Sequence, residues 1–359
     1  MIPASEAIQR PPDARLMIVD ATGCISDQPR STFVAFLRPG DLVVANDAAA
    51  IPASLSGVHL PTGRIIEVRL AGRHSVAPND VHEFCAIVFG AGDFRTRTED
   101  RAAPPHLSPG DQLLLGPLKA NVNRLLGHPR LVSLCFQDPP DGVWAGIAHH
   151  GRPIQYSHVQ APLAMWDVWT PIAGPPVAFE PPSAGFALDW HALAEMRAKG
   201  VDFVTITHAA GISSTGDPEL DVRLPFDEPY RIPRAAALAI RKAKARGGRI
   251  VAIGTTVVRA LEHAARAGQV RAGEDIATQR IGADSQLRLV DAILSGTHEP
   301  GTSHYELLRA FLDDNELTRV TAELNARGYR THEFGDSVLI VRRPRTLPGI
   351  RTSRYYLRA

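Results

Sequence analysis

The segment with the clearest chemical potential spans residues 249–262, where an apolar run passes through a Gly-Thr-Thr turn into a helical pattern. Gly254 permits a tight turn, and Thr255 or Thr256 is suited to cap the helix that follows. Such a helix N-terminus presents free N–H groups and a positive dipole end to an anionic or electron-rich ligand. Arg259 lies early in this helix, where the dipole disfavours a cation. We expect Arg259 to hold a ligand carboxylate or phosphate, the alternative being an internal salt bridge.

Two further strand ends carry polar side chains. Asn46 and Asp47 follow an apolar strand at 42–45, and the carboxyl edge of an α/β sheet is where ligands bind. Asp47 there is suited to accept hydrogen bonds from a ribose or to steady a cationic substrate, although the spacing alone favours a local Asx turn. His208 follows a strand at 202–207 and is a candidate for acid–base chemistry or substrate binding, its alternative being a structural histidine.

Loops supply the next candidates. Ser183 and Gly185 belong to a loop of small residues, which lets a ligand approach the backbone or simply links two parts of the chain. Asp227 and Glu228 are adjacent acids in a loop, where mutual repulsion favours a raised pKa and a usable base. The alternative for both acids is a plain surface position.

The last candidates surround two turns near the C-terminal end. His298 lies in a polar loop after a strand, and Ser303 precedes a helix that it can cap or at which it can bind an anion. Asp336 occupies a turn before the final strand, placed either to bind a ligand or to make the turn. The sequence holds no P-loop, no G-x-G-x-x-G and no nucleophile elbow.

Composition restricts the function classes. A net charge of +1 over 359 residues excludes a protein that is basic throughout and binds nucleic acid by charge alone. Two basic clusters remain, either phosphate contacts or solvated faces: Arg234, Arg241, Lys242, Lys244, Arg246 and Arg249, then Arg342, Arg343, Arg345, Arg351, Arg354 and Arg358. No apolar run is long enough for a membrane span, so we expect no membrane partner. Three scattered cysteines without metal-ligand spacing predict reduced thiols, no metal site and a cytoplasmic location.

The pattern of apolar and polar residues changes twice along the chain. Short β-like runs at 64–70, 83–89, 112–115 and 130–136 alternate with turns and predict a small antiparallel barrel or sandwich. From 187 onward, helices at 190–199, 233–245 and 304–312 alternate with strands at 202–207, 249–253, 287–292 and 337–341. We predict an α/β domain, a mixed sheet with flanking helices, at 1–57 and 152–359, interrupted by an inserted small antiparallel β-barrel domain at 58–151.

Taken in order, several segments resemble the S-adenosylmethionine:tRNA ribosyltransferase-isomerase family of queuosine biosynthesis. The Gly-Thr-Thr-x-Val-Arg-x-Leu-Glu match at 254–262 is the most specific one. The other matching segments are 37–47 with 51–53, 182–185, 290–294 with 298–300, and 334–340. The resemblance implies an α/β domain interrupted by a β-barrel, which agrees with the change of pattern described above.

The resemblance also implies a reaction. The family moves the ribosyl part of S-adenosylmethionine, its co-substrate, onto a 7-aminomethyl-7-deazaguanine base at the tRNA wobble position. Epoxyqueuosine forms, adenine and methionine leave, and no metal takes part. A base must remove a C5′ hydrogen beside the sulfonium and a donor should protonate adenine, so the candidates for these roles are Asp47, Glu228 and His298. Arg259 would hold a methionine carboxylate or a phosphate, and backbone amides near Gly185 and Thr255 would bind ribose or phosphate.

The chain departs from the family pattern at polar positions. Ala48 and Ala49 replace a threonine and an arginine, Ser54 replaces a second arginine, and two histidine-bearing loops lack their histidines. Three functions therefore remain open. The first is the family reaction on the anticodon loop of tRNA by a monomeric enzyme. The second is a divergent paralogue that binds S-adenosylmethionine or another nucleoside and uses a different acceptor, and the third is a non-catalytic RNA-binding protein.

Overall fold

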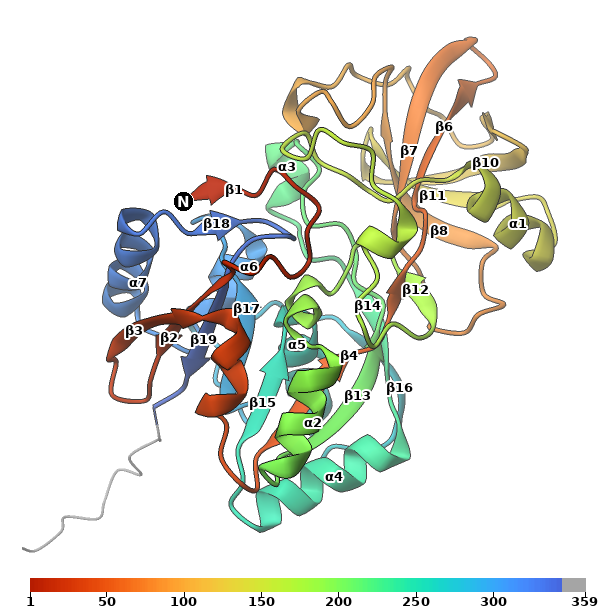
Figure 1. Cartoon of the computed structure of the whole chain (residues 1–359). Coiled ribbons are helices and arrows are strands. Elements are labelled where there is room, and N and C mark those ends of the chain that lie inside the picture. The colour runs from red at the N-terminus through yellow and green to blue at the C-terminus, as the bar shows by residue number, and fades with distance from the viewer. Residues whose placement is uncertain (344–359) are drawn as a thin grey trace, which may run out of the picture.

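A mixed sheet of nine strands forms one half of the molecule in this computed structural model, which describes residues 1–343 (Figure 1). Its strands are β2 (Arg15–Val19), β3 (Ile25–Pro29), β4 (Leu42–Asn46), β13 (Asp202–His208), β14 (Glu228–Ile232), β15 (Ile250–Ile253), β16 (Gly273–Ala277), β17 (Ala292–Gly296) and β19 (Ser337–Val341). They lie in the order β16-β14-β13-β4-β15-β17-β19-β2-β3. The four central strands β13, β4, β15 and β17 are parallel, so their carboxyl ends meet at one edge.

Strand β4 confirms that the early apolar run belongs to this sheet. It pairs in parallel with β13 and β15, at the centre of the parallel strands. Leu42 and Val44 pack into the core on one face, and Val43 and Ala45 pack into the core on the other. A strand buried on both faces needs a continuous apolar sequence, as found here.

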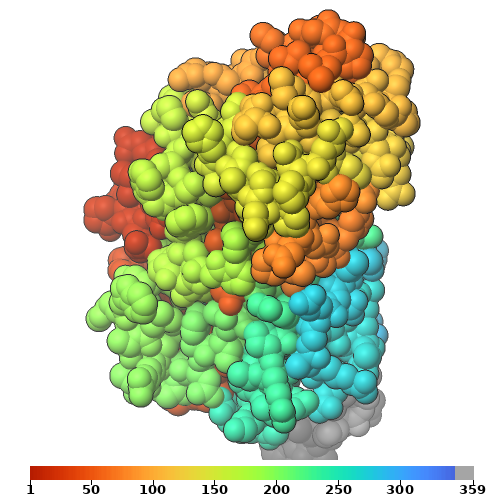
Figure 2. Space-filling model, turned by 90° about the vertical axis from the view of Figure 1, so that its right-hand side faces the viewer, coloured from red at the N-terminus to blue at the C-terminus, as the bar shows by residue number. Residues whose placement is uncertain are grey.

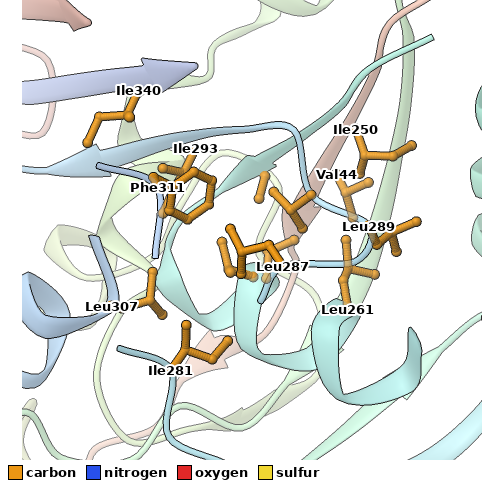
Figure 3. Close-up of a cluster of buried hydrophobic side chains, with 14 of the residues drawn as sticks. Val44, Ile250, Leu261, Ile281, Leu287, Leu289, Ile293, Leu307, Phe311 and Ile340 are labelled. Carbon is orange, nitrogen blue, oxygen red and sulfur yellow. The ribbon is translucent and has the colours of Figure 1, made fainter. Parts of the chain in front are cut away.

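Helices cover both faces of the sheet. The larger core contains side chains of α4 (Arg234–Ala245), α5 (Thr255–Ala264) and α7 (Asp314–Ala326), and the opposite one contains those of the 3₁₀ helix η1 (Arg30–Phe36) and α2 (Trp190–Ala198). Figure 3 shows part of the larger core, where Val44 and Ile250 from the sheet approach Leu261 from α5. These packed layers fix the position of the strand ends at which the candidate site lies.

The other half of the molecule is a closed antiparallel barrel. Its strands are β6 (Ser54–His59), β7 (Arg64–Gly72), β8 (Glu83–Phe89), β9 (Gln112–Leu115), β10 (Leu118–His128) and β11 (Leu131–Phe136), followed by α1 (Pro140–His150). A Cβ on Gly57 would lie 2.2 Å from the Leu114 carbonyl oxygen, so glycine is required where β6 meets β9. Figure 2 shows the barrel, orange to yellow, above the green to cyan part of the α/β half.

The barrel confirms the predicted fold class, although β6 and β10 were not predicted. Its strands run from Ser54 to Phe136, whereas the predicted insertion covers 58–151, and the division into domains stays a prediction. Shorter elements complete the fold: β1 (Ile2–Pro3) with β18 (Arg330–Thr331), β5 (Ala49–Ala50) with β12 (Pro176–Ala178), α3 (Pro218–Asp221), and α6 (Ser303–Leu308), which ends before the predicted limit of 312. No helix in residues 1–343 combines the length and apolar character that a membrane crossing requires.

The strand predicted at 287–292 was wrong, because β17 starts at Ala292. The carboxylate of Glu262 in α5 accepts hydrogen bonds from the backbone amides of Arg288, Leu289 and Val290 at 2.7, 3.0 and 2.8 Å. These amides are therefore not available to a strand ladder. The apolar side chains in this segment are buried by packing on α5 and the sheet, which explains why their pattern resembled a strand.

Candidate functional site

Two adjoining cavities lie at the carboxyl ends of the central strands. The inner cavity has a volume of about 100 Å³ and is lined by residues that follow β13, β15 and β17. The outer cavity has about 500 Å³ and extends to the loop at 331–333. Both are lined by Glu180, Pro181, Ser183, Ser213, His298 and His304. Segments far apart in the sequence thus converge at one edge of the sheet.

The Gly-Thr-Thr turn lies at the inner cavity. Gly254 has a φ of 93°, a conformation that favours glycine, and it is itself the N-cap of α5. The predicted capping by Thr255 or Thr256 was wrong, because no side chain caps this helix. All three residues line the inner cavity. The helix N-terminus, with its unpaired N–H groups, is therefore located where a ligand would bind.

Arg259 forms the internal salt bridge that was the alternative to ligand binding. Its guanidinium pairs with Glu228, and both side chains are buried although they line the inner cavity. Its other contacts are the carbonyl oxygens of Phe226, Ala277 and Gln279, at 2.7, 2.8 and 2.9 Å. Glu228 lies in strand β14 rather than in a loop, and its second oxygen accepts from the Gly211 amide at 2.6 Å. Because the two charges neutralise each other, the pair holds the cavity wall in place and leaves little free charge for a ligand.

His208 and Asn46 lie behind the cavity and do not line it. His208 is fully buried, and burial lowers its pKa to about 4, so the ring is neutral at physiological pH. Its Nε2 lies 3.4 Å from the Glu228 carboxylate. The Asn46 amide accepts from the His208 N–H at 2.9 Å and from the Ala48 N–H at 3.0 Å. The second bond is the predicted Asx turn, and Asn46 ties β4 to β13.

Asp47, Gly185 and Asp336 also lie outside both linings. Asp47 directly follows Asn46, the last residue of β4, and successive side chains of a strand point to opposite faces. The Asp47 carboxylate accepts hydrogen bonds from the hydroxyls of Thr205 and Thr207 at 2.7 Å each. A Cβ on Gly185 would lie 3.0 Å from the side chain of Thr170. Asp336 accepts from the backbone amide of Arg330 at 2.8 Å, which closes the loop at 330–336, and from that of Arg15 in β2 at 2.9 Å.

His298 is the predicted acid–base candidate that lines both cavities. Its ring stacks on His304 at 4.6 Å, and its Nε2 lies 3.0 Å from the Ser295 hydroxyl. Burial, with smaller contributions from His304 and His332, holds the pKa of His298 well below its usual value. The ring is therefore neutral at physiological pH and is suited to hydrogen-bond a ligand rather than to take up a proton. Ser303 begins α6 and lines the inner cavity, while Thr302 is the cap of that helix.

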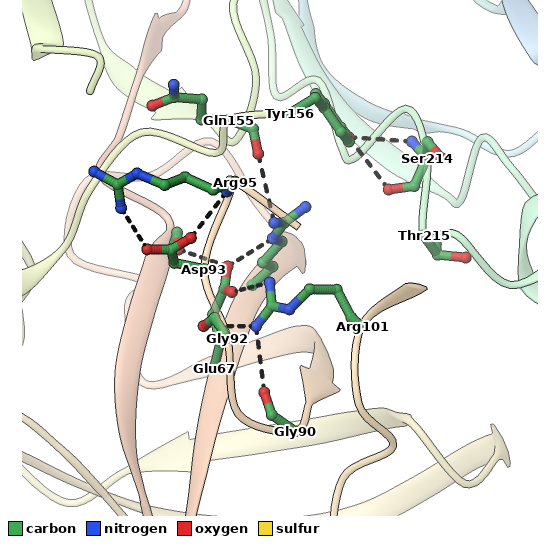
Figure 4. A network of polar contacts seen from close by, with 12 residues as sticks. Glu67, Gly90, Gly92, Asp93, Arg95, Arg101, Gln155, Tyr156, Ser214 and Thr215 are labelled. Carbon is green, nitrogen blue, oxygen red and sulfur yellow. Dashed lines mark hydrogen bonds and ion pairs between the residues drawn. The ribbon is translucent and has the colours of Figure 1, made fainter. Parts of the chain in front are cut away.

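Sequence reasoning missed Glu180, which lies immediately before the small-residue loop that it did single out. The residue is 7% exposed, and the Tyr156 hydroxyl donates a hydrogen bond to its carboxylate. Burial, reinforced by the negative charge of Glu333, raises the pKa of Glu180 to about 7. Figure 4 shows Tyr156 beside Ser214, whose amide donates to the Tyr156 oxygen at 3.3 Å. The only available signal was an acid at the end of the apolar run 177–179.

The outer cavity holds a second group of titratable side chains that was not predicted. His158, His332 and Glu333 offer ligand atoms within 4.8 Å of one another, and His158 Nε2 lies 3.2 Å from the Glu333 carboxylate. The two imidazole rings stack at 4.1 Å and are tilted by 16°. Because the two rings are nearly parallel, their nitrogen lone pairs do not point at a common position in these side-chain conformations.

The predicted basic clusters lie away from the cavities or outside the described residues. Arg246 pairs with Asp202 and Arg249 with Asp41, both at the amino ends of strands and so at the opposite edge of the sheet. Arg342 pairs with Asp291, and Arg343 pairs with Glu316. Arg345, Arg351, Arg354 and Arg358 lie outside the described residues. Cys24, Cys85 and Cys135 are free thiols, as expected.

Comparison with known proteins connects this arrangement to one family. The sequence model described as "Queuosine biosynthesis protein" matches residues 2–340. Curated relatives named "S-adenosylmethionine:tRNA ribosyltransferase-isomerase" include one from Citrifermentans bemidjiense, 30% identical over 91% of this chain and 92% of that protein. Another, from Sorangium cellulosum, is 32% identical over 94% and 96% of the two chains.

A solved structure agrees with the fold. The crystal structure of an S-adenosylmethionine tRNA ribosyltransferase from Thermotoga maritima aligns with a TM-score of 0.50 at 24% identity. The alignment covers 95% of this chain and 96% of the Thermotoga maritima chain. This likeness concerns the architecture, an α/β half joined to a barrel, rather than individual site residues.

Proposed function

The chain belongs to the queuosine biosynthesis protein family, and we propose that it transfers and isomerises the ribosyl part of S-adenosylmethionine onto tRNA. The acceptor in this proposal is a 7-aminomethyl-7-deazaguanine base in the anticodon loop. Epoxyqueuosine is the product, and adenine and methionine leave. S-adenosylmethionine is the co-substrate, and the chemistry invokes no metal.

The observation that carries the proposal is the paired cavity at the carboxyl ends of the central strands. The family motif supplies Gly254, Thr255 and Thr256 to the lining of the inner cavity. The wider outer cavity opens beside it and shares Glu180 and His298 with it. Two connected chambers suit a reaction of two substrates, one small and one presented as an unpaired base.

The residues divide the proposed work according to their environments. The N-terminus of α5 stabilises an electron-rich part of the co-substrate through its free N–H groups. His298 is neutral and a weak base, since its pKa lies well below its usual value, and its ring nitrogens hydrogen-bond the substrates at the cavity. The pair of Arg259 and Glu228 holds β14 against α5 and so fixes the cavity wall. We further propose that the protein acts as a monomer in the cytoplasm.

The test is an assay of the full-length protein with S-adenosylmethionine and tRNA that bears the aminomethyl precursor base. The proposal predicts release of adenine and methionine in equal amounts, with epoxyqueuosine in the recovered tRNA. Transfer RNA with an ordinary guanine at the wobble position is the matched control and should give no release. Absence of adenine release with the precursor tRNA would contradict the proposal.

A second candidate is a paralogue that binds S-adenosylmethionine or another nucleoside and uses a different acceptor. It is favoured by Ala48, Ala49 and Ser54 at positions where the family carries polar or cationic groups. It is also favoured by the absence of the described members of the two basic clusters from both cavity linings. Calorimetry distinguishes the two, because this candidate predicts nucleoside binding with no affinity for precursor tRNA at low salt.

A further inference from the structure

Glu180 occupies the junction of the two cavities. It contributes to the lining of the inner cavity, of the outer cavity and of a smaller space beneath them. The residue is only 7% exposed, so it is largely removed from bulk water yet borders the space where two substrates would meet. Neither Gly254 nor His332 lines both cavities, whereas Glu180 does.

No cation pairs with this carboxyl group among the described residues, as the ion pairs of residues 1–343 show. Two other buried acids have cation partners: Glu67 pairs with Arg69 and Arg101, and Glu228 pairs with Arg259. The titratable and charged groups that act on Glu180 or line its cavities are Tyr156, Glu333, Arg69, Arg97, Glu99, Glu228, Arg259, Glu299, His158, His298, His304 and His332. Glu180 therefore does not serve to neutralise a cation in an ion pair.

The hydrogen bonds at Glu180 favour its charged form without removing its basicity. Tyr156 donates from its hydroxyl, and Ser213 donates as well. Burial and the nearby Glu333 act in the opposite direction and prevail, so the pKa lies at about 7. A general base works best when its pKa is close to the operating pH.

We propose that Glu180 is the general base that removes the C5′ proton of S-adenosylmethionine, a role that rests on the proposed function. The C5′–H bond breaks, and its electron pair stays on C5′ beside the positively charged sulfur. The carboxylate becomes a neutral acid. The electron pair on C5′ becomes a C4′–C5′ double bond as the C4′–O4′ bond breaks, and O4′ forms a carbonyl at C1′ as adenine leaves with the electron pair of its glycosidic bond. Adenine takes the proton from Glu180, so the carboxylate is restored and the charges balance.

The experiment measures adenine release by the full-length protein with precursor tRNA across pH 5–9, for the parent, Glu180→Gln, Glu180→Asp and Tyr156→Phe. Glu180→Gln should lower kcat by about 10²- to 10⁴-fold, the usual contribution of a general base, and calorimetry should show retained affinity for S-adenosylmethionine. Glu180→Asp keeps a carboxylate and should retain measurable turnover. Glu274→Gln on the exposed edge strand β16 is the control and should match the parent.

Tyr156→Phe supplies a readout that a merely structural role would not move. Loss of the hydroxyl removes a hydrogen bond that stabilises the carboxylate, so the rising limb of the pH–kcat profile should shift to higher pH. A parent-like kcat for Glu180→Gln, or an unshifted profile for Tyr156→Phe, would overturn the role of Glu180 while the proposed function stands. A parent protein that releases no adenine would overturn the proposed function and this role together.

Discussion

The guanidinium of Arg259 in α5 is paired with the carboxylate of Glu228 in β14, and both groups are buried at the wall of the inner cavity. Three backbone carbonyl oxygens take further hydrogen bonds from the same guanidinium. The cation that stood out in the sequence, because it lies early in a helix, therefore joins a helix to a strand. The site is built on this connection.

Arg259→Ala should destabilise the fold by about 3–5 kcal/mol, because it leaves the Glu228 charge buried without its partner. Chemical denaturation followed by circular dichroism measures the change. Arg266→Ala, at an exposed position just beyond the same helix, is the matched control and should stay within about 0.5 kcal/mol of the parent. Unchanged stability of Arg259→Ala combined with lost nucleoside affinity would show that the arginine binds ligand instead.

Glu262→Ala should destabilise the protein by about 2–4 kcal/mol, because three buried or half-buried backbone amides at 288–290 lose their hydrogen-bond acceptor. Urea titration of the variant measures this loss, and hydrogen exchange should show faster exchange confined to these amides and their neighbours. Glu323→Ala, whose carboxylate pairs with Arg327 on α7, provides a surface comparison with little effect. Equal stability of the two variants would contradict the account of this segment.

The buried Glu180 predicts a specific pH dependence of stability. Its pKa is about 7 in the folded chain and near 4.5 when unfolded, so between these values the folded state binds the additional proton. Its contribution to stability is complete below pH 4.5 and is lost as the pH rises through 7, by about 3 kcal/mol. His208, with its lowered pKa of about 4, has the opposite effect between pH 4 and 6.5.

Comparison of Glu180→Gln with the parent isolates the effect of Glu180, because His208 is present in both proteins. The free energy of unfolding of the variant minus that of the parent should increase from pH 4.5 to above 7. Urea denaturation at intervals of half a pH unit measures the difference. A difference that is flat across this range would mean that Glu180 has an ordinary pKa.

Asp47→Asn should lower stability by about 1 kcal/mol and leave the affinity for S-adenosylmethionine unchanged, because the Asp47 carboxylate bonds to Thr205 and Thr207 outside the cavity linings. Thermal denaturation and calorimetry measure the two quantities. A large loss of nucleoside affinity without a change in stability would restore Asp47 as a site residue.

The fold class was predictable because its signals are local. The continuous apolar sequence of β4 and the Gly-Thr-Thr turn into α5 each follow from a short window. Strand β6 was not predicted, since Ser54–His59 is rich in small and polar residues and is held by barrel closure through Gly57. The segment at 287–290 was wrongly predicted as a strand, because its apolar side chains are buried although its backbone forms no strand hydrogen bonds.

The site was only partly predictable, because burial and pairing depend on distant contacts. The motifs placed Gly254, Thr256 and His298 at one cavity, as the structure does. Glu180 had no motif of its own, and its raised pKa arises from burial beneath residues far away in sequence. Whether Arg259 faces a ligand or Glu228 depends on how β14 packs on α5, which no local pattern records.

The most direct test of the central claim is a crystal structure of the protein with S-adenosylmethionine bound. Density for the nucleoside is expected in the inner cavity, in contact with Gly254, Thr255 and Thr256, with C5′ within reach of Glu180. Density at any other surface, or an empty inner cavity at a saturating concentration of the nucleoside, would contradict this claim.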